Sequence, residues 1–449
     1  MQPNILFILI DGLRADQCFG AVKTADTTFL DSLITSGAYF KNTFSSADGT
    51  MISLNCILNS KPQFQIGIRA QKITLLEDNH LQKLKNSGYY ISGLIPKLTS
   101  LKPITDYFQN ENHTYNPGPP PETLTTGITE KISSLLNSLK NISPWFCYLH
   151  VFDLHPVKEG KKPLKIEEFQ SEKFGNTLYE QTASSVDHWL KKISAQINFD
   201  DTLLIITSDH GERIPFEDKS SFKFEPKFNS ATNIGRSVLP KSTHNLGGKV
   251  MGKLKRTIGK TKLNYSNKDL TPYQKRSRDP HFTLSLHDEL LHIPFLLKGS
   301  TLPSKIISNQ ISTLDFFPTI FELVGIMQNN TKYSSSLVPL INNQPLTEKA
   351  IFLHTIPYEK ESPLDRIGMR TSKYKYFRNS KNPKKDIHLY DLENDPYENN
   401  NISKNNLPVI EKMEKSLRDM QNDTLELDNT LSKEEEEKIS KELKKMGYM

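Results

Sequence analysis

The stretch Asn4-Ile-Leu-Phe-Ile-Leu-Ile10 is apolar from its second residue to its last, and Asp11 follows it directly. A strand with one face in water would alternate polar and apolar side chains, so this run predicts a strand buried on both faces, as in a parallel sheet. It is too short to cross a bilayer, which takes about eighteen apolar residues, and no basic leader precedes it. We therefore expect a core strand here, with no signal peptide and no transmembrane helix.

Two more apolar runs end close to acidic residues: 145–150 before Asp153, and Thr202–Thr207 before Asp209. Between the runs, apolar residues recur at three- and four-residue steps over 123–139 and 178–197, which predicts helices. Alternating strands and helices predict an α/β fold in which helices flank a mostly parallel sheet. Ligands of such sheets bind beyond the carboxyl ends of the strands, where these acidic residues stand.

The chain has 449 residues, which exceeds the usual size of one domain. We expect a catalytic domain over residues 1–345 and a small C-terminal α+β subdomain over residues 346–449. Strand-like pieces such as 373–378 predict a short antiparallel sheet in the subdomain. Lys and Glu at helical spacing over 432–449 predict a surface helix at its end.

A hydrophobic content of 36% and a mean hydropathy of −0.52 suggest that long polar insertions dilute an ordinary core. Residues 215–280, rich in Lys, Ser, Asn and Thr, read as one insertion. Eleven Lys or Arg stand against two Asp in 241–280. This part is either a solvated insert or a contact for an anionic surface. No nucleic-acid partner is expected. The three widely spaced cysteines disfavour a disulfide framework, which predicts a cytoplasmic protein.

The third run leads into Asp209-His-Gly-Glu212, where an adjacent carboxylate and imidazole could share one ion. Asp11 ends the first run in the same way. Carboxylate oxygens and imidazole nitrogens are common ligands of divalent cations. A single Asp after a strand is more often a helix cap than a ligand, but two strand ends of this kind favour a metal site.

Several stretches resemble the alkaline phosphatase superfamily, in particular its sulfatase-like branch. Residues 4–16 resemble the family's first metal-binding strand, and Asp209-His-Gly-Glu212 resembles its second. Later landmarks follow in the family's order: His287-Asp-Glu-Leu-Leu-His-Ile-Pro294, Asp315-Phe-Phe-Pro-Thr319, Tyr374-Lys-Tyr376, Leu389-Tyr-Asp-Leu-Glu-Asn-Asp-Pro396 with Asn400, and Leu443-Lys-Lys-Met-Gly-Tyr448. The resemblance implies an alkaline-phosphatase-like fold and a metal-dependent ester hydrolase.

The family's nucleophile opens a helix after the first Asp, and Thr50 takes that position here. Sulfatases carry Cys or Ser there, in a Cys-x-Pro-Ser-Arg pattern that is converted to formylglycine, and only Ser53 matches the rest of that pattern. A formylglycine hydrate expels sulfate by reverting to an aldehyde, a route that a threonine ester lacks, so Thr50 suits phosphoryl chemistry better. Its hydroxyl would need an adjacent cation and the positive end of a helix. The alternative is that Thr50 only caps the helix.

The resemblance also assigns substrate contacts. His155 matches a family His that touches the ester or protonates the leaving oxygen, and a pKa near neutrality suits that task. The alternative is a structural His. A second family His corresponds to His281, with His287 as a competitor. Lys97 resembles the lysine that binds a substrate oxygen, and an exposed lysine without a role is the alternative.

The ligand set implied by the resemblance is Asp11, Thr50, Asp209 and His210 around one divalent cation. Many sulfatases carry a second metal-binding Asp at the position of Gly12. The shorter set resembles phosphotransferase and phosphonate monoester hydrolase relatives, in which manganese is common. Mn, Ca, Zn and Mg all stay open, with Mn or Ca favoured.

The leading hypothesis is a hydrolase or transferase that cleaves a phosphate ester through a phospho-threonine intermediate at Thr50. The substrate would be a small-molecule or saccharide ester. One alternative is a sulfatase acting on a sulfated carbohydrate, because the landmarks are sulfatase-like. Another is a sulfatase-fold binding protein without catalysis, because the nucleophile loop is irregular and the second Asp is missing.

Overall fold

The computed structural model describes residues 2–67, 72–118, 120–159, 163, 165–214, 271–278, 285–355, 364–424 and 432–445. Most of the predicted insertion therefore lies outside the described residues, as does His281. In the described part of the chain, no helix combines the length and the apolarity that a bilayer-spanning segment needs.

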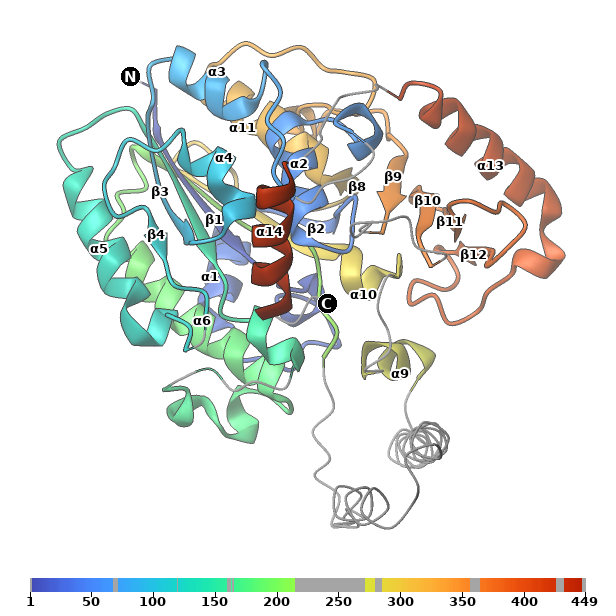
Figure 1. Cartoon of the computed structure of the whole chain (residues 1–449), viewed down its shortest axis with the longest axis horizontal. Coiled ribbons are helices and arrows are strands. Elements are labelled where there is room, and N and C mark those ends of the chain that lie inside the picture. The colour runs from blue at the N-terminus through green and yellow to red at the C-terminus, as the bar shows by residue number, and fades with distance from the viewer. Residues whose placement is uncertain are drawn as a thin grey trace.

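The main sheet has eight strands in the order β4-β3-β5-β1-β6-β7-β2-β8 (Figure 1). Strand β7 runs antiparallel to both of its neighbours, β6 and β2, and the other pairs are parallel. The prediction of an α/β fold with a mostly parallel sheet is confirmed. The strands are β1 Asn4–Ile10, β2 Ala38–Phe44, β3 Tyr90–Pro96, β4 Thr114–Tyr115, β5 Trp145–Val151, β6 Thr202–Thr207, β7 His292–Lys298 and β8 Lys305–Ser312.

Strand β1 lies at the centre of this sheet, and all seven of its residues are buried. Alternate side chains enter two different cores, because successive strand residues point to opposite faces. Leu6, Ile8 and Ile10 pack with the face covered by α1, α5 and α6, and the residues between them pack with the face covered by α2, α3 and α11. The sheet is therefore sandwiched between two helical layers (Figure 1).

The longer helices of these two layers begin and end as follows: α1 Thr28–Ser36, α2 Thr50–Asn59, α3 His80–Asn86, α5 Thr129–Ser138, α6 Leu178–Ser194 and α11 Phe316–Leu323. Short helices lie in the connections: α4 Lys102–Thr105, α9 Pro272–Arg278, α10 Asp288–Leu291 and α12 Val338–Ile341.

A second sheet, fully antiparallel, has the order β12-β11-β10-β9. Helix α13 (Leu407–Gln421) covers it through Met413 and Leu417, and α2 of the main layer reaches the same core. This confirms the predicted C-terminal antiparallel subdomain, whereas the boundary at residue 345 stays a prediction. The strands are β9 Ile351–His354, β10 Arg366–Arg370, β11 Tyr374–Asn379 and β12 His388–Asp391.

The predicted terminal helix is present as α14 (Lys433–Lys445). It lies in the part of the molecule that contains the main sheet, away from the small sheet (Figure 1). Glu442 accepts hydrogen bonds from the backbone N–H and the hydroxyl of Thr99, at 2.8 and 2.7 Å. The end of the chain is thus tied to the loop that follows β3.

Candidate active site

Three candidate metal ligands meet where β1 and β6 end. Asp11 follows β1, and Asp209 and His210 follow β6, which is the parallel neighbour of β1. One ligand atom from each of the three side chains lies within 4.8 Å of the others, and all three residues are buried. The sheet order therefore produces the cluster, because parallel neighbours end at the same edge.

Thr50 is the first residue of α2 and faces this cluster. Its hydroxyl donates to Asp11 Oδ2 at 3.0 Å, and its Oγ1 lies 3.3 Å from His210 Nε2. The loop before it is fixed by a bridge between Ala47 and His354 of β9. The small sheet thus helps to place the start of α2, whose N-terminal N–H groups favour an anion.

The donor atoms of the cluster fit a divalent cation. Asp209 Oδ1 accepts from the N–H groups of Gly12 and His210, at 3.3 and 2.9 Å. Asp209 Oδ2 is buried, accepts no hydrogen bond within the described residues, and lies 3.5 Å from His210 Nε2. His210 Nδ1 donates to Gly211 O at 2.6 Å, so the lone pair of the neutral ring is on Nε2. An outer hydrogen bond of this kind is typical of metal-binding histidines.

The electrostatics also suit a cation. Burial disfavours the ionised form of Asp209, and the nearby charge of Asp11 adds to this, so its pKa is raised. The pKa of His210 is raised despite burial, because the carboxylates of Asp209 and Asp11 favour its protonated form. Two neighbouring buried carboxylates need positive charge between them, and a bound cation would supply it.

Asp11 is surrounded by imidazoles. His155 Nδ1 donates to its Oδ1 at 3.1 Å, and His150 Nε2 donates to its Oδ2 at 3.4 Å. Burial opposes ionisation of Asp11, but His155, His150 and His210 together hold its pKa well below the usual range. The predicted general acid therefore lies against the Asp11 carboxylate, with its ring stacked on Phe152.

Gly12 has a structural reason to be glycine. Its φ of +73° lies in the left-handed region, and a Cβ there would meet Glu212 Cβ at 3.3 Å. Its carbonyl accepts from the Tyr179 hydroxyl at 2.6 Å. At this position, where the resemblance implies a second metal-binding Asp, the chain has a glycine whose backbone N–H donates to Asp209 Oδ1.

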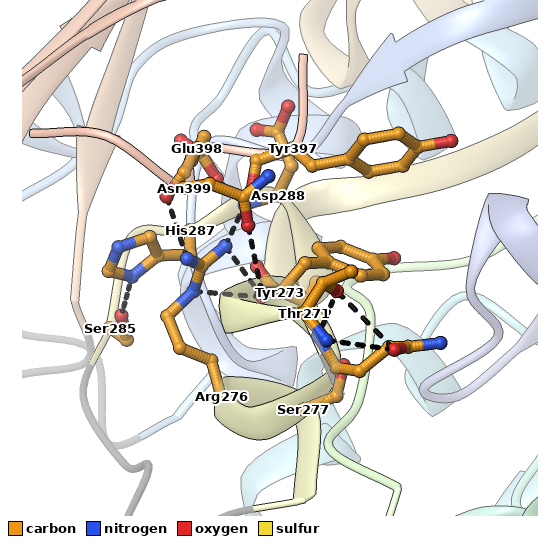
Figure 2. A network of polar contacts seen from close by, with 12 residues as sticks. Thr271, Tyr273, Arg276, Ser277, Ser285, His287, Asp288, Tyr397, Glu398 and Asn399 are labelled. Carbon is orange, nitrogen blue, oxygen red and sulfur yellow. Dashed lines mark hydrogen bonds and ion pairs between the residues drawn. The ribbon is translucent and has the colours of Figure 1, made fainter. Parts of the chain in front are cut away.

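The other predicted site residues are Lys97, His281 and His287. Lys97 is exposed just beyond β3, and no hydrogen bond among the described residues involves its ammonium. His281 lies outside the described residues, so its role stays a prediction. Its competitor His287 is buried between Ser285, 2.6 Å from its Nδ1, and Tyr390 of the small sheet, 3.0 Å from its Nε2 (Figure 2 shows the Ser285 contact).

Sequence reasoning missed two supporting groups. The Tyr148 hydroxyl donates to His150 Nδ1 at 3.1 Å, behind Asp11. Ser208 Oγ donates to His210 O at 2.7 Å and accepts from Leu13 N at 3.0 Å. The two-residue spacing of Tyr148 and His150 on β5 was a usable signal, since it puts both on one face of the strand.

Two family models match the chain: "Sulfatase" over residues 3–326, and "N-sulphoglucosamine sulphohydrolase, C-terminal" over residues 282–418. The chain therefore belongs to the sulfatase family of ester hydrolases. Arylsulfatase K of Rattus norvegicus is 23% identical over 313 residues, which cover 66% of this chain and 52% of the rat protein. The chain thus spans about half the length of this relative.

Solved structures share the fold at low identity. A 2-O GAG sulfatase aligns with a TM-score of 0.64 and 15% identity, over 94% of this chain and 93% of that one. The phosphonate monoester hydrolase of Agrobacterium radiobacter aligns with a TM-score of 0.62 and 15% identity, over 94% and 96%. A protein in complex with its substrate D-glucosamine-2-N,6-O-disulfate aligns with a TM-score of 0.62 and 15% identity, over 94% and 98%.

Proposed function

We propose that this chain cleaves a phosphate ester, with Thr50 as nucleophile and Asp11, Asp209 and His210 as ligands of one divalent cation. The contact between the Thr50 hydroxyl and Asp11, beside His210 and at the start of α2, carries the proposal. A bound cation would stabilise the alkoxide and neutralise an oxygen of the ester. Mn²⁺ or Ca²⁺ is the ion we favour.

In the proposed reaction, the Thr50 hydroxyl loses its proton to solvent, Oγ1 attacks the phosphorus, and the bond from phosphorus to the alcohol oxygen breaks. The alcohol oxygen takes a proton from His155 as it leaves. Asp11 Oδ1 accepts from Nδ1 of that ring, so it supports the protonated form that a general acid needs. Water or an acceptor alcohol then attacks the phosphorus and gives its proton to His155. The bond from phosphorus to Thr50 Oγ1 breaks, and Oγ1 takes a proton back from solvent. Lys97 and His281 are proposed to bind oxygens of the transferred group.

The test is a set of three aryl esters offered to metal-stripped and reloaded protein: p-nitrophenyl phosphate, bis-p-nitrophenyl phosphate and p-nitrophenyl sulfate. We expect turnover of a phosphate ester that needs the added cation, and a mass increase of one phosphoryl group on the peptide that contains Thr50. Turnover of all three esters that is unchanged after metal removal would contradict the proposal.

A second candidate is hydrolysis of a sulfate ester on a carbohydrate. It is favoured by the match to the N-sulphoglucosamine sulphohydrolase model and by the likeness to a structure that holds a disulfated glucosamine. The same assay separates the two, because a sulfatase would prefer the sulfate ester. A third outcome, cation binding without turnover of any ester, would support a binding protein that has lost catalysis.

A further inference from the structure

Arg276 of helix α9 joins the catalytic core to the C-terminal part of the chain. Its Nε donates to Glu289 Oε1 at 2.9 Å. Its two terminal nitrogens donate to backbone carbonyls of the segment after β12, to Glu398 O at 2.7 Å and to Tyr397 O at 2.8 Å. Figure 2 shows Arg276 with Tyr397 and Glu398. The planar guanidinium, with its fixed fork of donors, suits such a three-way contact.

Glu289 depends on this arginine. Its side chain is fully buried in α10, and burial raises its pKa to about 7. The charge of Arg276, whose Nη2 lies 2.8 Å from Oε1, favours the ionised form. Without the arginine, the buried Glu289 carboxylate would lose its main compensating charge. Either α10 would then shift, or Glu289 would take up a proton.

The backbone of the same segment touches the turn that carries the metal ligands. Gly211 N donates to Leu290 O at 2.8 Å. A Cβ on Gly211 would lie 2.3 Å from Glu289 O, so the two backbones are in close contact. Gly211 O in turn accepts from His210 Nδ1. The place of Glu289 therefore sets where Gly211 sits and how the His210 ring is oriented.

Helix α9 also holds the far side of this turn. Ser277 Oγ accepts from Arg14 Nη1 at 2.9 Å, and Ser277 O accepts from Ile214 N at 2.9 Å. The same nitrogen of Arg14 donates to Glu212 O at 3.2 Å. Ile214 directly, and Glu212 through Arg14, are thus anchored to one short helix just after Gly211.

We propose that Arg276 is a positioning residue of the metal centre: by holding Glu289 in place, it fixes the turn that presents Asp209 and His210 to the cation. This rests on the proposed metal-dependent function. The same contacts tie residues 397–398, beyond the small sheet, to the metal-binding turn. Arg276 touches neither Thr50 nor a metal ligand through any contact of the described residues, so its effect passes through Glu289.

The test is calorimetric titration of Mn²⁺ into the metal-stripped full chain. We expect Arg276→Met to weaken Mn²⁺ binding by about tenfold or more, as for other outer-shell partners of metal ligands. Arg276→Lys should recover part of the loss, because it keeps the charge. Lys275→Met, on the exposed side of the same helix, is the matched control and should bind as the parent does.

The outcomes separate the two proposals. A parent chain that does not bind Mn²⁺ counts against the metal-dependent function. A parent that binds, with Arg276→Met binding equally well, overturns the positioning role.

A double-mutant cycle tests whether Arg276 acts on the metal-binding turn through Glu289. In a Glu289→Gln background, Arg276→Met leaves no buried charge behind, so its effect on Mn²⁺ affinity should shrink to about threefold or less. An equal loss in both backgrounds overturns the path through Glu289. If Arg276→Met does not fold, Arg276→Lys in the two backgrounds decides the question, with near-ultraviolet circular dichroism as the check on folding.

Discussion

The Thr50 hydroxyl contacts two of the three clustered ligands, which makes it the most direct residue to test. We expect Thr50→Ala to lower kcat on a phosphate ester by at least about 10³-fold, because the attacking oxygen is gone. Thr50→Ser keeps the oxygen and should retain a measurable share of the activity. Steady-state kinetics at saturating metal provide the measurement.

Metal binding is the control for this variant. Thr50→Ala leaves Asp11, Asp209 and His210 in place, so cation affinity should fall much less than kcat does. An alanine variant as active as the parent would exclude the Thr50 hydroxyl as the nucleophile.

Asp153 offers a pH-dependent test of burial. Its side chain is buried, Oδ1 accepts from Leu124 N at 3.0 Å, and burial raises its pKa to about 7. The folded state therefore keeps a proton that the unfolded state releases near pH 4. Ionisation of Asp153 in the unfolded chain favours unfolding, so the free energy of unfolding falls increasingly as pH rises from 4 to 7. Asp153→Asn should gain about 2 to 3 kcal/mol relative to the parent between pH 5 and pH 8.

Urea unfolding at the two pH values measures this difference. The exposed Asp200→Asn is the matched control and should show no such trend. A constant difference between Asp153→Asn and its parent across this range would mean that the carboxyl group does not titrate there.

At the residue scale, Asp11, Asp209 and His210 could be predicted because they come just after recognisable strands, and Thr50 could be predicted from the family resemblance. The structure brings all four together. The sequence could not predict that His155 and His150 face Asp11. That contact depends on β5 lying beside β1, and no local sequence pattern predicts the order of strands in a sheet.

At the scale of the elements, the turn after β1 gives a prediction, because Gly12 stands in it with a left-handed backbone conformation. A side chain at φ +73° costs about 1 to 2 kcal/mol. Gly12→Ala should therefore destabilise the protein by at least that much, since the new Cβ also crowds Glu212. Gly299→Ala, where a Cβ meets only ordinary contacts, is the control, and denaturant unfolding compares the two.

Most elements could be predicted because a buried strand or an amphipathic helix has a periodic pattern of its own. The helix expected over 123–139 shows where this fails. It is split into Leu124–Ile128 and α5, because Thr126 and Gly127 leave helical geometry, with Gly127 at φ +128°. A single glycine in a periodic segment did not reveal that break. The antiparallel direction of β7 was equally hidden, since it depends on tertiary pairing.

At the scale of the whole molecule, a buried charge network joins the two sheets. Lys375 of β11 is fully buried, and its Nζ lies 2.6 Å from Asp288 Oδ1 and 2.7 Å from Glu398 Oε1. Lys375→Met would leave these carboxylates with too little positive charge, so we expect it to lower the free energy of unfolding by about 3 to 5 kcal/mol.

Lys373→Met removes a lysine two residues away whose ion pair with Glu393 is exposed. It should lower the free energy of unfolding far less than Lys375→Met does, because solvent screens such a pair. Equal effects of the two substitutions would show that the network contributes no more than a surface ion pair.

The central place of β1 has a consequence for how the protein is made. Leu6 pairs with Cys147 on one side and Leu204 on the other, so both neighbours are translated long after β1 itself. At roughly 5 to 20 residues per second, the apolar strand waits about seven to thirty seconds on the ribosome before the first of them has been made. An unpaired apolar strand in a nascent chain is prone to aggregate, so we expect β1 to depend on a chaperone during synthesis, although all seven of its residues are buried in the folded chain.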